Sequence, residues 1–340
     1  MPLPFRPNCL PTALGPLPHR TAHAAWDLCL RYLPAALPLP LLVHDGEDPA
    51  ALAADGFGGA TIAMDQLRFD PAAAVESFDD LYLAYLKNQI GTRALELHAL
   101  DEWAQREAQI RRAQVVSTVL MGPISLALRL VDDDGLPALI NGTTVDALSK
   151  HLYLRLQWQH ATLRSNAQTL LQWLYEPYLD VVGSPFSPVG WAEAHQLLEE
   201  TFGPRSGVRG VWVSETTDLP ALLDGSTVEV VGLPLPLPTV AESWLPALQG
   251  FIRRRGAIGW GIVPQTTEGL AHATIGRLSA RFAAVLQALE EGGLPTADVV
   301  GASLIMPEDT LGNLEPAEAE AALAMTSRLS GMLRHSYGLD

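Results

Sequence analysis

Short apolar runs alternate with longer amphipathic stretches along most of this chain. The apolar runs predict strands at residues 39–44, 60–64, 114–120, 170–175, 209–214, 227–233, 257–263 and 300–306. Patterns with helical spacing lie between them, most clearly over 144–168 and 274–293. Alternating strands and helices predict a parallel sheet, and about eight repeats predict a closed (β/α)8 TIM barrel.

The same pattern predicts a single domain over residues 1–340, because no linker, repeat or low-complexity tract divides the sequence. The segment near 66–110 is expected to be a long, mainly helical insertion between two strands. The first strand stays open at this level. Either residues 12–15 form it and 39–44 is accessory, or 39–44 is itself a barrel strand.

Composition narrows the classes of partner. Apolar residues make up 48% of the chain, which is enough for a large core, and the net charge is −16. A chain this acidic has no electrostatic reason to bind nucleic acid or an anionic membrane. The run Arg253–Arg255 ends a predicted helix, where cations interact favourably with the helix dipole.

Cysteine content and the first residues bear on the cellular compartment. Cys9 and Cys29 form neither a disulfide framework nor a Cys-x-x-Cys metal motif. The proline-rich start does not resemble a signal peptide, and no apolar run reaches the length of a membrane span. We expect a cytoplasmic protein.

In such a barrel, function gathers where strands end at the C-terminal face. Glu176 follows an apolar strand and precedes a proline, which suits a general base or a ligand for an amine or hydroxyl. The alternative is a carboxylate that caps the next helix. Asp309, with Glu308 before it, follows another strand and is a second candidate, against the alternative of a solvated loop.

Other strand ends supply weaker candidates. His19 and His44 follow predicted strands and are candidate mouth residues. His19 and His23 have the spacing of a helical metal pair, but a helix start between them argues against that site. Glu215 is a further candidate for the mouth, whereas Asp218 is predicted to cap the following helix.

Several of these strand ends carry a family resemblance. The stretch "LGPLPHRTAHAAWDLCLRYLP" resembles the opening of the cobalamin-independent methionine synthase family in its short single-barrel form, within the superfamily shared with uroporphyrinogen decarboxylases. Four later segments are similar to family segments in the same order: "MGPISLALRLVDDDGLPAL", "YEPYL", "GAIGWGIVPQTTE" and "SLIMPEDTLGNL". The resemblance spans about residues 12–333. It implies a barrel in which zinc-bound homocysteine thiolate is methylated to methionine.

The positions that the resemblance assigns to zinc have lost their ligands. The family's His-x-Cys pair falls on Trp212 and Ser214, its glutamate near Gly232, and its last cysteine near Asp309. The aspartate before the Glu-Pro pair is replaced by Tyr175. No metal is therefore predicted, and a zinc-dependent homocysteine methyltransferase is not expected. We predict no cofactor, while a corrinoid methyl donor stays open.

Three hypotheses follow. The first is a methyl or one-carbon transferase without the zinc–thiolate site, with catalytic Glu176, Asp309 and His19 and a substrate pocket formed by Tyr175, Trp212, Ser214, Glu215, Trp260 and His44. The second is a non-catalytic barrel, or pseudoenzyme, which binds a small molecule in its mouth or serves as partner of a corrinoid protein or an active paralogue. The third is a harder cation held by oxygen ligands from Asp309, Glu176 and Glu215 together with His19.

Overall fold

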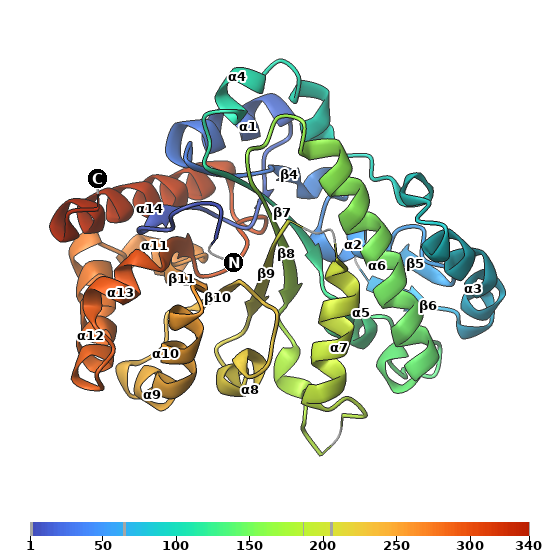
Figure 1. Ribbon diagram of the computed structural model, residues 1–340. Helices are drawn as coiled ribbons and strands as arrows, with labels where there is room; N and C mark the ends of the chain where they lie inside the picture. The colour runs from blue at the N-terminus through green and yellow to red at the C-terminus, as the bar shows by residue number, and fades with distance from the viewer. Residues whose placement is uncertain (1–2, 64–65, 186, 205–206, 340) are drawn as a thin grey trace.

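The computed structural model describes residues 3–63, 66–185, 187–204 and 207–339. Eight parallel strands form a nearly closed barrel with helices around it (Figure 1). The order around the sheet is β1 (Leu10–Pro11), β12 (Ser303–Pro307), β11 (Ala257–Val263), β10 (Val230–Pro234), β9 (Val208–Val213), β8 (Leu170–Glu176), β7 (Val115–Met121) and β3 (Ala36–Pro38). The predicted TIM barrel is confirmed.

The seam between β1 and β3 is closed by two short strands further along the chain. β2 (Pro16–Leu17) follows β1, β4 (Leu41–Leu42) follows β3, and the two pair in parallel. Gly15 has φ +114°, and a Cβ on it would lie 2.7 Å from the Leu39 carbonyl oxygen, so this turn requires glycine. Residues 12–15 thus connect β1 and β2, which are two pieces of the first strand. The predicted strand at 39–44 overlaps β4, which continues the second strand after β3.

The predicted strand at 60–64 is wrong as a barrel strand. β5 (Ala60–Ala63) pairs antiparallel with β6 (Gln66–Phe69) in a separate hairpin, and residue 64 lies outside the described residues. The side chains of Thr61 and Ile62 are exposed. Apolar patterning identifies a strand but not its partner, and here the partner is local.

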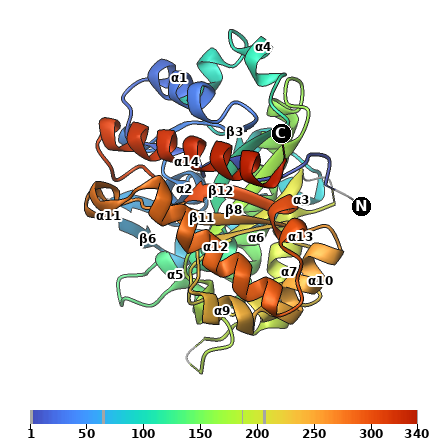
Figure 2. The same ribbon diagram turned by 90° about the vertical axis from the view of Figure 1, so that its left-hand side faces the viewer.

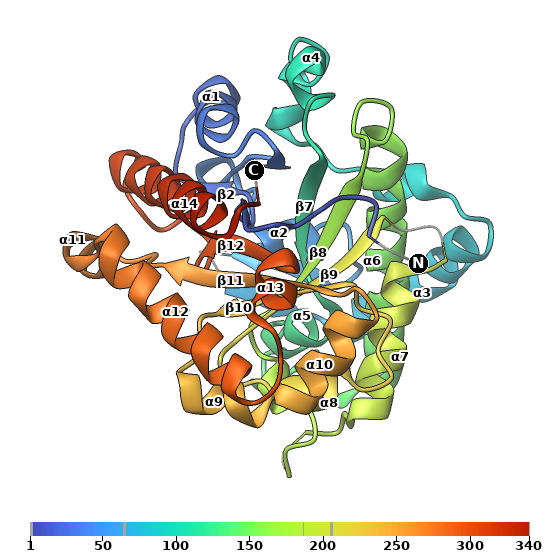
Figure 3. The same cartoon turned by 60° about the vertical axis from the view of Figure 1, so that its left-hand side comes forward.

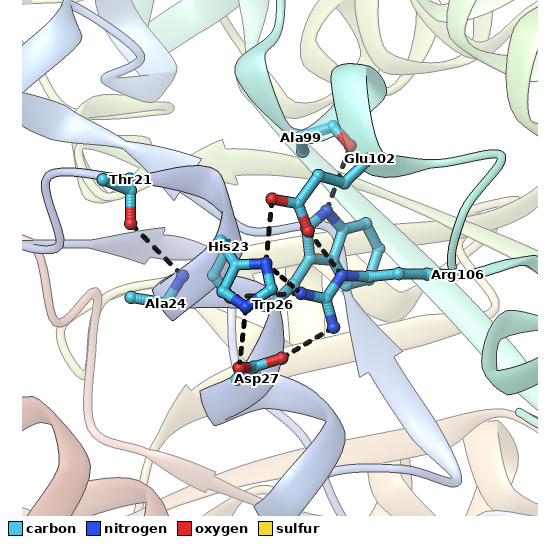
Figure 4. Close-up of polar contacts among 8 residues, drawn as sticks. All are labelled: Thr21, His23, Ala24, Trp26, Asp27, Ala99, Glu102 and Arg106. Carbon is cyan, nitrogen blue, oxygen red and sulfur yellow. Dashed lines mark hydrogen bonds and ion pairs between the residues drawn. The ribbon is translucent and has the colours of Figure 1, made fainter.

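The insertion is largely helical after its first strand. It contains β6, α3 (Pro71–Leu86), the 3₁₀ turns η2 (Ile90–Arg93) and η3 (His98–Glu102), and α4 (Glu107–Ile110). The insertion packs against helix α1 (Ala22–Tyr32), and Figure 4 shows the polar contacts between them. Arg106 donates from Nη1 to Asp27 at 2.7 Å and from Nε to Glu102 at 2.7 Å, and the Trp26 indole N–H donates to the Ala99 carbonyl at 3.0 Å.

The remaining helices surround the barrel (Figures 2 and 3). They are η1 (Val43–Asp45), α2 (Pro49–Ala54), α5 (Pro123–Arg129), η4 (Ala138–Ile140), α6 (Gly142–Leu163), η5 (Leu179–Val181), α7 (Trp191–Phe202), α8 (Leu219–Leu223), α9 (Pro238–Ser243), α10 (Leu245–Arg253), α11 (Thr267–His272), α12 (Ile275–Glu291), α13 (Thr296–Gly301) and α14 (Pro316–Tyr337). α6 and α12 are the two helices that the sequence predicted most clearly. Within the described part of the chain, none of the helices combines the length and apolarity needed to cross a bilayer.

Candidate functional site

Two tryptophans fill the barrel interior. Trp173 of β8 and Trp212 of β9 are 0% and 1% exposed. A Cβ on Gly232 of β10 would lie 2.3 Å from Cε3 of Trp212, and one on Gly261 of β11 would lie 3.0 Å from its Cη2. Because protein interiors are close-packed, the Trp212 ring fits only where these neighbouring strands carry glycine.

A hydrogen-bonded bridge crosses the barrel mouth above this layer. The Tyr175 hydroxyl lies 2.9 Å and 3.0 Å from the two carboxylate oxygens of Asp309. Tyr175 lies one residue before the end of β8 and Asp309 follows β12, and these strands stand on opposite sides of the barrel in the sheet order. The Thr310 N–H also donates to Asp309, at 2.7 Å. The bridge therefore links the end of β8 to the loop that follows β12, across the barrel mouth.

Burial sets the protonation of both groups in the bridge. It raises the pKa of Asp309, against the hydrogen bonds from Thr310 and Tyr175, which lower it. Burial, followed by the charge of Asp309, raises the pKa of Tyr175. Tyr175 therefore stays a neutral donor, and Asp309 is more readily protonated than an exposed aspartate.

The positions that the sequence resemblance assigns to zinc do not form a metal-binding group among the described residues. The Trp212 ring packs over Gly232, and the Asp309 carboxylate is held by Tyr175. The Ser214 hydroxyl lies 3.0 Å from that of Thr216. Among the residues described, no group of three or more His, Cys, Asp or Glu side chains is arranged to hold a metal ion. The replaced positions contact one another in pairs, Trp212 with Gly232 and Tyr175 with Asp309.

Glu176 is engaged by a helix rather than by the mouth. Its carboxylate accepts hydrogen bonds from the backbone N–H groups of Ile124 at 3.0 Å and Ser125 at 2.7 Å, in the first turn of α5. A Cβ on Gly122 would lie 2.2 Å from Glu176 Oε1, so glycine makes room for the carboxylate. Burial raises the pKa of Glu176 to about 7, opposed by hydrogen bonds from Ser125 and Ile124. The carboxylate therefore caps a helix, but that helix is α5, which precedes β8 in the chain, and not the next helix, as the alternative expected.

Trp260 also lies away from the mouth. It is fully buried, its indole N–H donates to Ser303 Oγ at 2.9 Å, and its ring is 6.2 Å from that of Phe282 on α12. The residue therefore faces outward from β11, into the layer between sheet and helices. Its pocket assignment is corrected, because side chains alternate between the two faces of a strand.

His19 lies in the loop before α1, beside Glu320 of α14. Burial lowers the pKa of His19, while the charge of Glu320 raises it. Its Nδ1 atom is buried and has no hydrogen-bond partner within the described ranges. No contact joins His19 to Glu176, Asp309 or Glu215 among these residues, so the four proposed cation ligands are not assembled.

Glu308, which follows β12 and precedes Asp309, interacts with charged residues nearby. Glu308 lies 3.4 Å from Arg281, and burial raises the pKa of Glu308 against the effect of that arginine. The charge of the exposed Glu215 raises the same pKa, which places Glu215 near Glu308. Asp218 accepts a hydrogen bond from the Ala221 N–H at 3.1 Å, and its predicted helix cap is confirmed.

An off-axis cavity of about 590 Å³ opens beside the bridge. It lies between the ends of β2 and β4, the β5–β6 hairpin and the loop after β12, and its lining includes His44, Asp48, Ile62, Arg129 and Thr310. Thr310 is bonded to Asp309, and the charge of Asp48 adds to the raised pKa of Tyr175. The cavity therefore adjoins the Tyr175–Asp309 bridge. Of the predicted pocket residues, His44 lines it.

Sequence reasoning missed Arg129 and Asp48. Arg129 ends α5 and is partly exposed, and its side chain makes no ion pair or hydrogen bond with any residue the structure describes. Asp48 accepts the Ala50 N–H at 2.9 Å as N-cap of α2, with Pro49 at the first helical position. The Asp-Pro pair is a readable helix-start signal, but nothing in the sequence placed Arg129 opposite it.

Comparisons with known proteins agree with the fold. No family model matches the chain, and no curated protein sequence matches it. A methyltransferase from Methanosarcina mazei has a similar structure, at 14% identity and a TM-score of 0.50, over 96% of this chain and 95% of that one. A B12-independent methionine synthase from Shewanella sp. W3-18-1, in complex with selenomethionine, matches 70% of this chain and 68% of its own, at 11% identity and a TM-score of 0.49. At 14% identity, the likeness to the Methanosarcina mazei protein is one of fold.

Proposed function

We propose that this chain is a methionine synthase-like or methyltransferase-like barrel that binds a small zwitterionic, amino-acid-like molecule in the mouth cavity, without a zinc–thiolate site. One observation carries the proposal. Arg129 and Asp48, of opposite charge, line a single cavity at the C-terminal end of the strands. Ligand sites commonly combine such a few polar groups with apolar walls.

Each part of the ligand has a matching group. The Arg129 guanidinium suits a carboxylate, because its donors bind two oxygens at once. Asp48, fixed by its role as a helix cap, suits an ammonium group. Ile62 and Leu67 of the hairpin supply apolar contact for a side chain. The aromatic layer formed by Trp173 and Trp212 closes the barrel axis below and leaves this off-axis position for the ligand.

Methyl or one-carbon transfer is the second candidate, and the Tyr175–Asp309 bridge favours it. Asp309 has a raised pKa and adjoins the cavity through Thr310, so it is suited to accept a proton from a substrate heteroatom. The methyl donor is not identified, and a corrinoid is one candidate. Trp212 and Gly232 fit each other closely, so the barrel interior is well packed although the zinc ligands are missing. This supports a barrel that binds a ligand over one that serves only as a structural partner subunit.

Calorimetric titration tests the binding proposal, with L-methionine and L-leucine as probes. We expect saturable binding of at least one, and weak or no binding of methionine amide, which lacks the carboxylate. Arg129→Gln should weaken binding about tenfold or more, because a hydrogen bond to a charged group is lost. The matched control is Arg328→Gln, an exposed arginine on α14. Wild-type affinity in Arg129→Gln, or no binding of either amino acid, would refute the proposal.

The transferase candidate has its own readout. Tyr175→Phe removes the hydroxyl that lowers the pKa of Asp309. If Asp309 accepts a proton during turnover, the acidic limb of the pH–rate profile should move to higher pH in this variant. An unchanged profile would leave Asp309 with a structural role only.

A further inference from the structure

Two neighbouring cavities lie at the opposite end of the barrel from the mouth. The first, of about 380 Å³, lies between residues 3–8, the end of α10 and α13; Figure 3 shows both helices. The second, of about 540 Å³, lies where β9 and β10 begin. Arg255 and Gly256 line both cavities, so the two share a wall.

Arginine dominates the charge of this paired cavity. Arg6 and Arg255 line the first part, and Arg209, Arg254 and Arg255 line the second. The carboxylates in the lining are Asp298 and Glu229, and Glu229 already accepts the Arg209 backbone N–H at 3.0 Å. In a chain of net charge −16, four arginines against two carboxylates form a local excess of positive charge.

Two of these arginines have unused donors. Arg6 and Arg255 are exposed, and their side chains make no hydrogen bond or ion pair with any of the residues described. Arg254 is anchored, because its Nη1 donates to the Leu223 carbonyl at 3.0 Å and its guanidinium lies 4.9 Å from the Phe251 ring centroid. The paired cavity thus combines fixed and available guanidinium groups.

The backbone holds Arg255 in a conformation that favours glycine. Its φ is +68°, just after the end of α10. The Arg255 N–H donates to the Ile252 carbonyl at 2.8 Å and the Gly256 N–H to that of Phe251 at 2.9 Å, which is the Schellman pattern of a helix end. An arginine is strained at this position, and its side chain stands on the wall common to both cavities.

We propose that the paired cavity binds a small molecule bearing two or more linked phosphates. Guanidinium forks match phosphate oxygens, and the hydroxyls of Ser226 and Thr227 line the same space. Two adjoining cavities with arginine in each suit an anion of extended length better than a single phosphate. This site is independent of the ligand proposed for the mouth.

Titration of the full chain with inorganic tripolyphosphate at low ionic strength tests the proposal. We expect one saturable site, weakened by added salt. Arg255→Gly should weaken binding about tenfold, since it removes a charged donor, while thermal stability stays at or above wild type because glycine relieves the strained backbone. Arg253→Gln is the matched control from the same run; this exposed residue does not line either cavity and should bind normally.

Three other outcomes would overturn the proposal. Equal weakening by the two variants would indicate attraction by net charge alone and overturn the site. Absence of saturable binding would do the same, as would binding of a polyglutamate peptide without binding of tripolyphosphate, which points to an acidic protein segment. If tripolyphosphate binds, tighter binding of ATP would assign the phosphates to a nucleotide.

Discussion

At the scale of single residues, neighbours in sequence serve opposite faces of the barrel wall. Tyr175 reaches across the mouth to Asp309, whereas Glu176 points to the N-terminus of α5. The alternation of side chains along β8 separates the two. A residue at a strand end is therefore assigned to the mouth or to the helix layer by its register and not by its chemistry.

The buried carboxyl of Glu176 makes stability depend on pH. Its pKa rises from 4.5 to about 7 on burial, so the folded state holds the proton more tightly than the unfolded chain. The contribution of Glu176 to the free energy of unfolding is complete below pH 4.5 and is lost as pH rises through 7. We expect Glu176→Gln to flatten the fall in stability across this range by up to about 3 kcal/mol.

Urea unfolding at several pH values between these limits measures that slope. The comparison between wild type and Glu176→Gln isolates one group, because other buried acids titrate in both proteins. Parallel curves for the two proteins would contradict the assignment.

The fit of Trp212 against glycine predicts a local intolerance to side chains. Gly232→Ala places a Cβ 2.3 Å from the indole and should lower the free energy of unfolding by about 1–3 kcal/mol through overpacking. Gly250→Ala is the control: it lies in α10, meets nothing within 4 Å, and should raise stability by up to about 1 kcal/mol. Chemical denaturation of both variants checks this, and equal effects would argue against a close-packed interior.

At the scale of elements, the insertion is held to α1 by a buried cation as well as by apolar packing. The Arg106 side chain is 10% exposed and lies between Asp27 and Glu102, with His23 at its edge (Figure 4). The contact between Arg106 and Asp27 joins residues 79 positions apart in the chain. The insertion is therefore part of the barrel's packing and not an appendage.

Removing this cation should loosen the insertion first. Arg106→Met leaves two carboxylates without their shared partner, and we expect a loss of about 2 kcal/mol. Hydrogen exchange should rise most over residues 90–113. Arg111→Met, which breaks an exposed pair with Glu107, should change stability by less than about 0.5 kcal/mol. Uniform exchange across the barrel in Arg106→Met would show that the contact acts globally.

At the scale of the whole molecule, packing and hydrogen bonding across the axis stabilise the barrel. Trp173 and Trp212 occupy the interior, and the Tyr175–Asp309 bridge ties opposite strands. Groups that bind only the folded state add to its stability by mass action, so a structural metal would leave a clear signature.

We expect purified protein to contain far less than one equivalent of zinc, and its melting temperature to be unchanged by EDTA or by added zinc. Mass spectrometry of the metal content and thermal unfolding measure this directly. Stoichiometric zinc, lost with a fall in melting temperature on chelation, would return the chain to thiol methyl transfer with ligands that the sequence did not reveal.

By itself, the sequence determined the barrel, because periodic burial along strands and helices is a local property that residue order records. It also specified helix caps such as Asp218, which act within one turn. It failed for the run at 60–64, since patterning does not reveal which strand is the partner. Patterning also does not reveal which groups a side chain meets, so the sequence left Glu176 between a role in the mouth and a role as a helix cap.

Only the tertiary structure decided which side chains meet. The pairing of Trp212 with Gly232 and of Tyr175 with Asp309 joins residues far apart in the chain, and each pair depends on strand register. Register likewise placed Trp260 outside the barrel interior, and the packing of α5 against α2 brought Arg129 to the same cavity as Asp48. Contacts across a closed sheet are set by global geometry, and no local pattern encodes them.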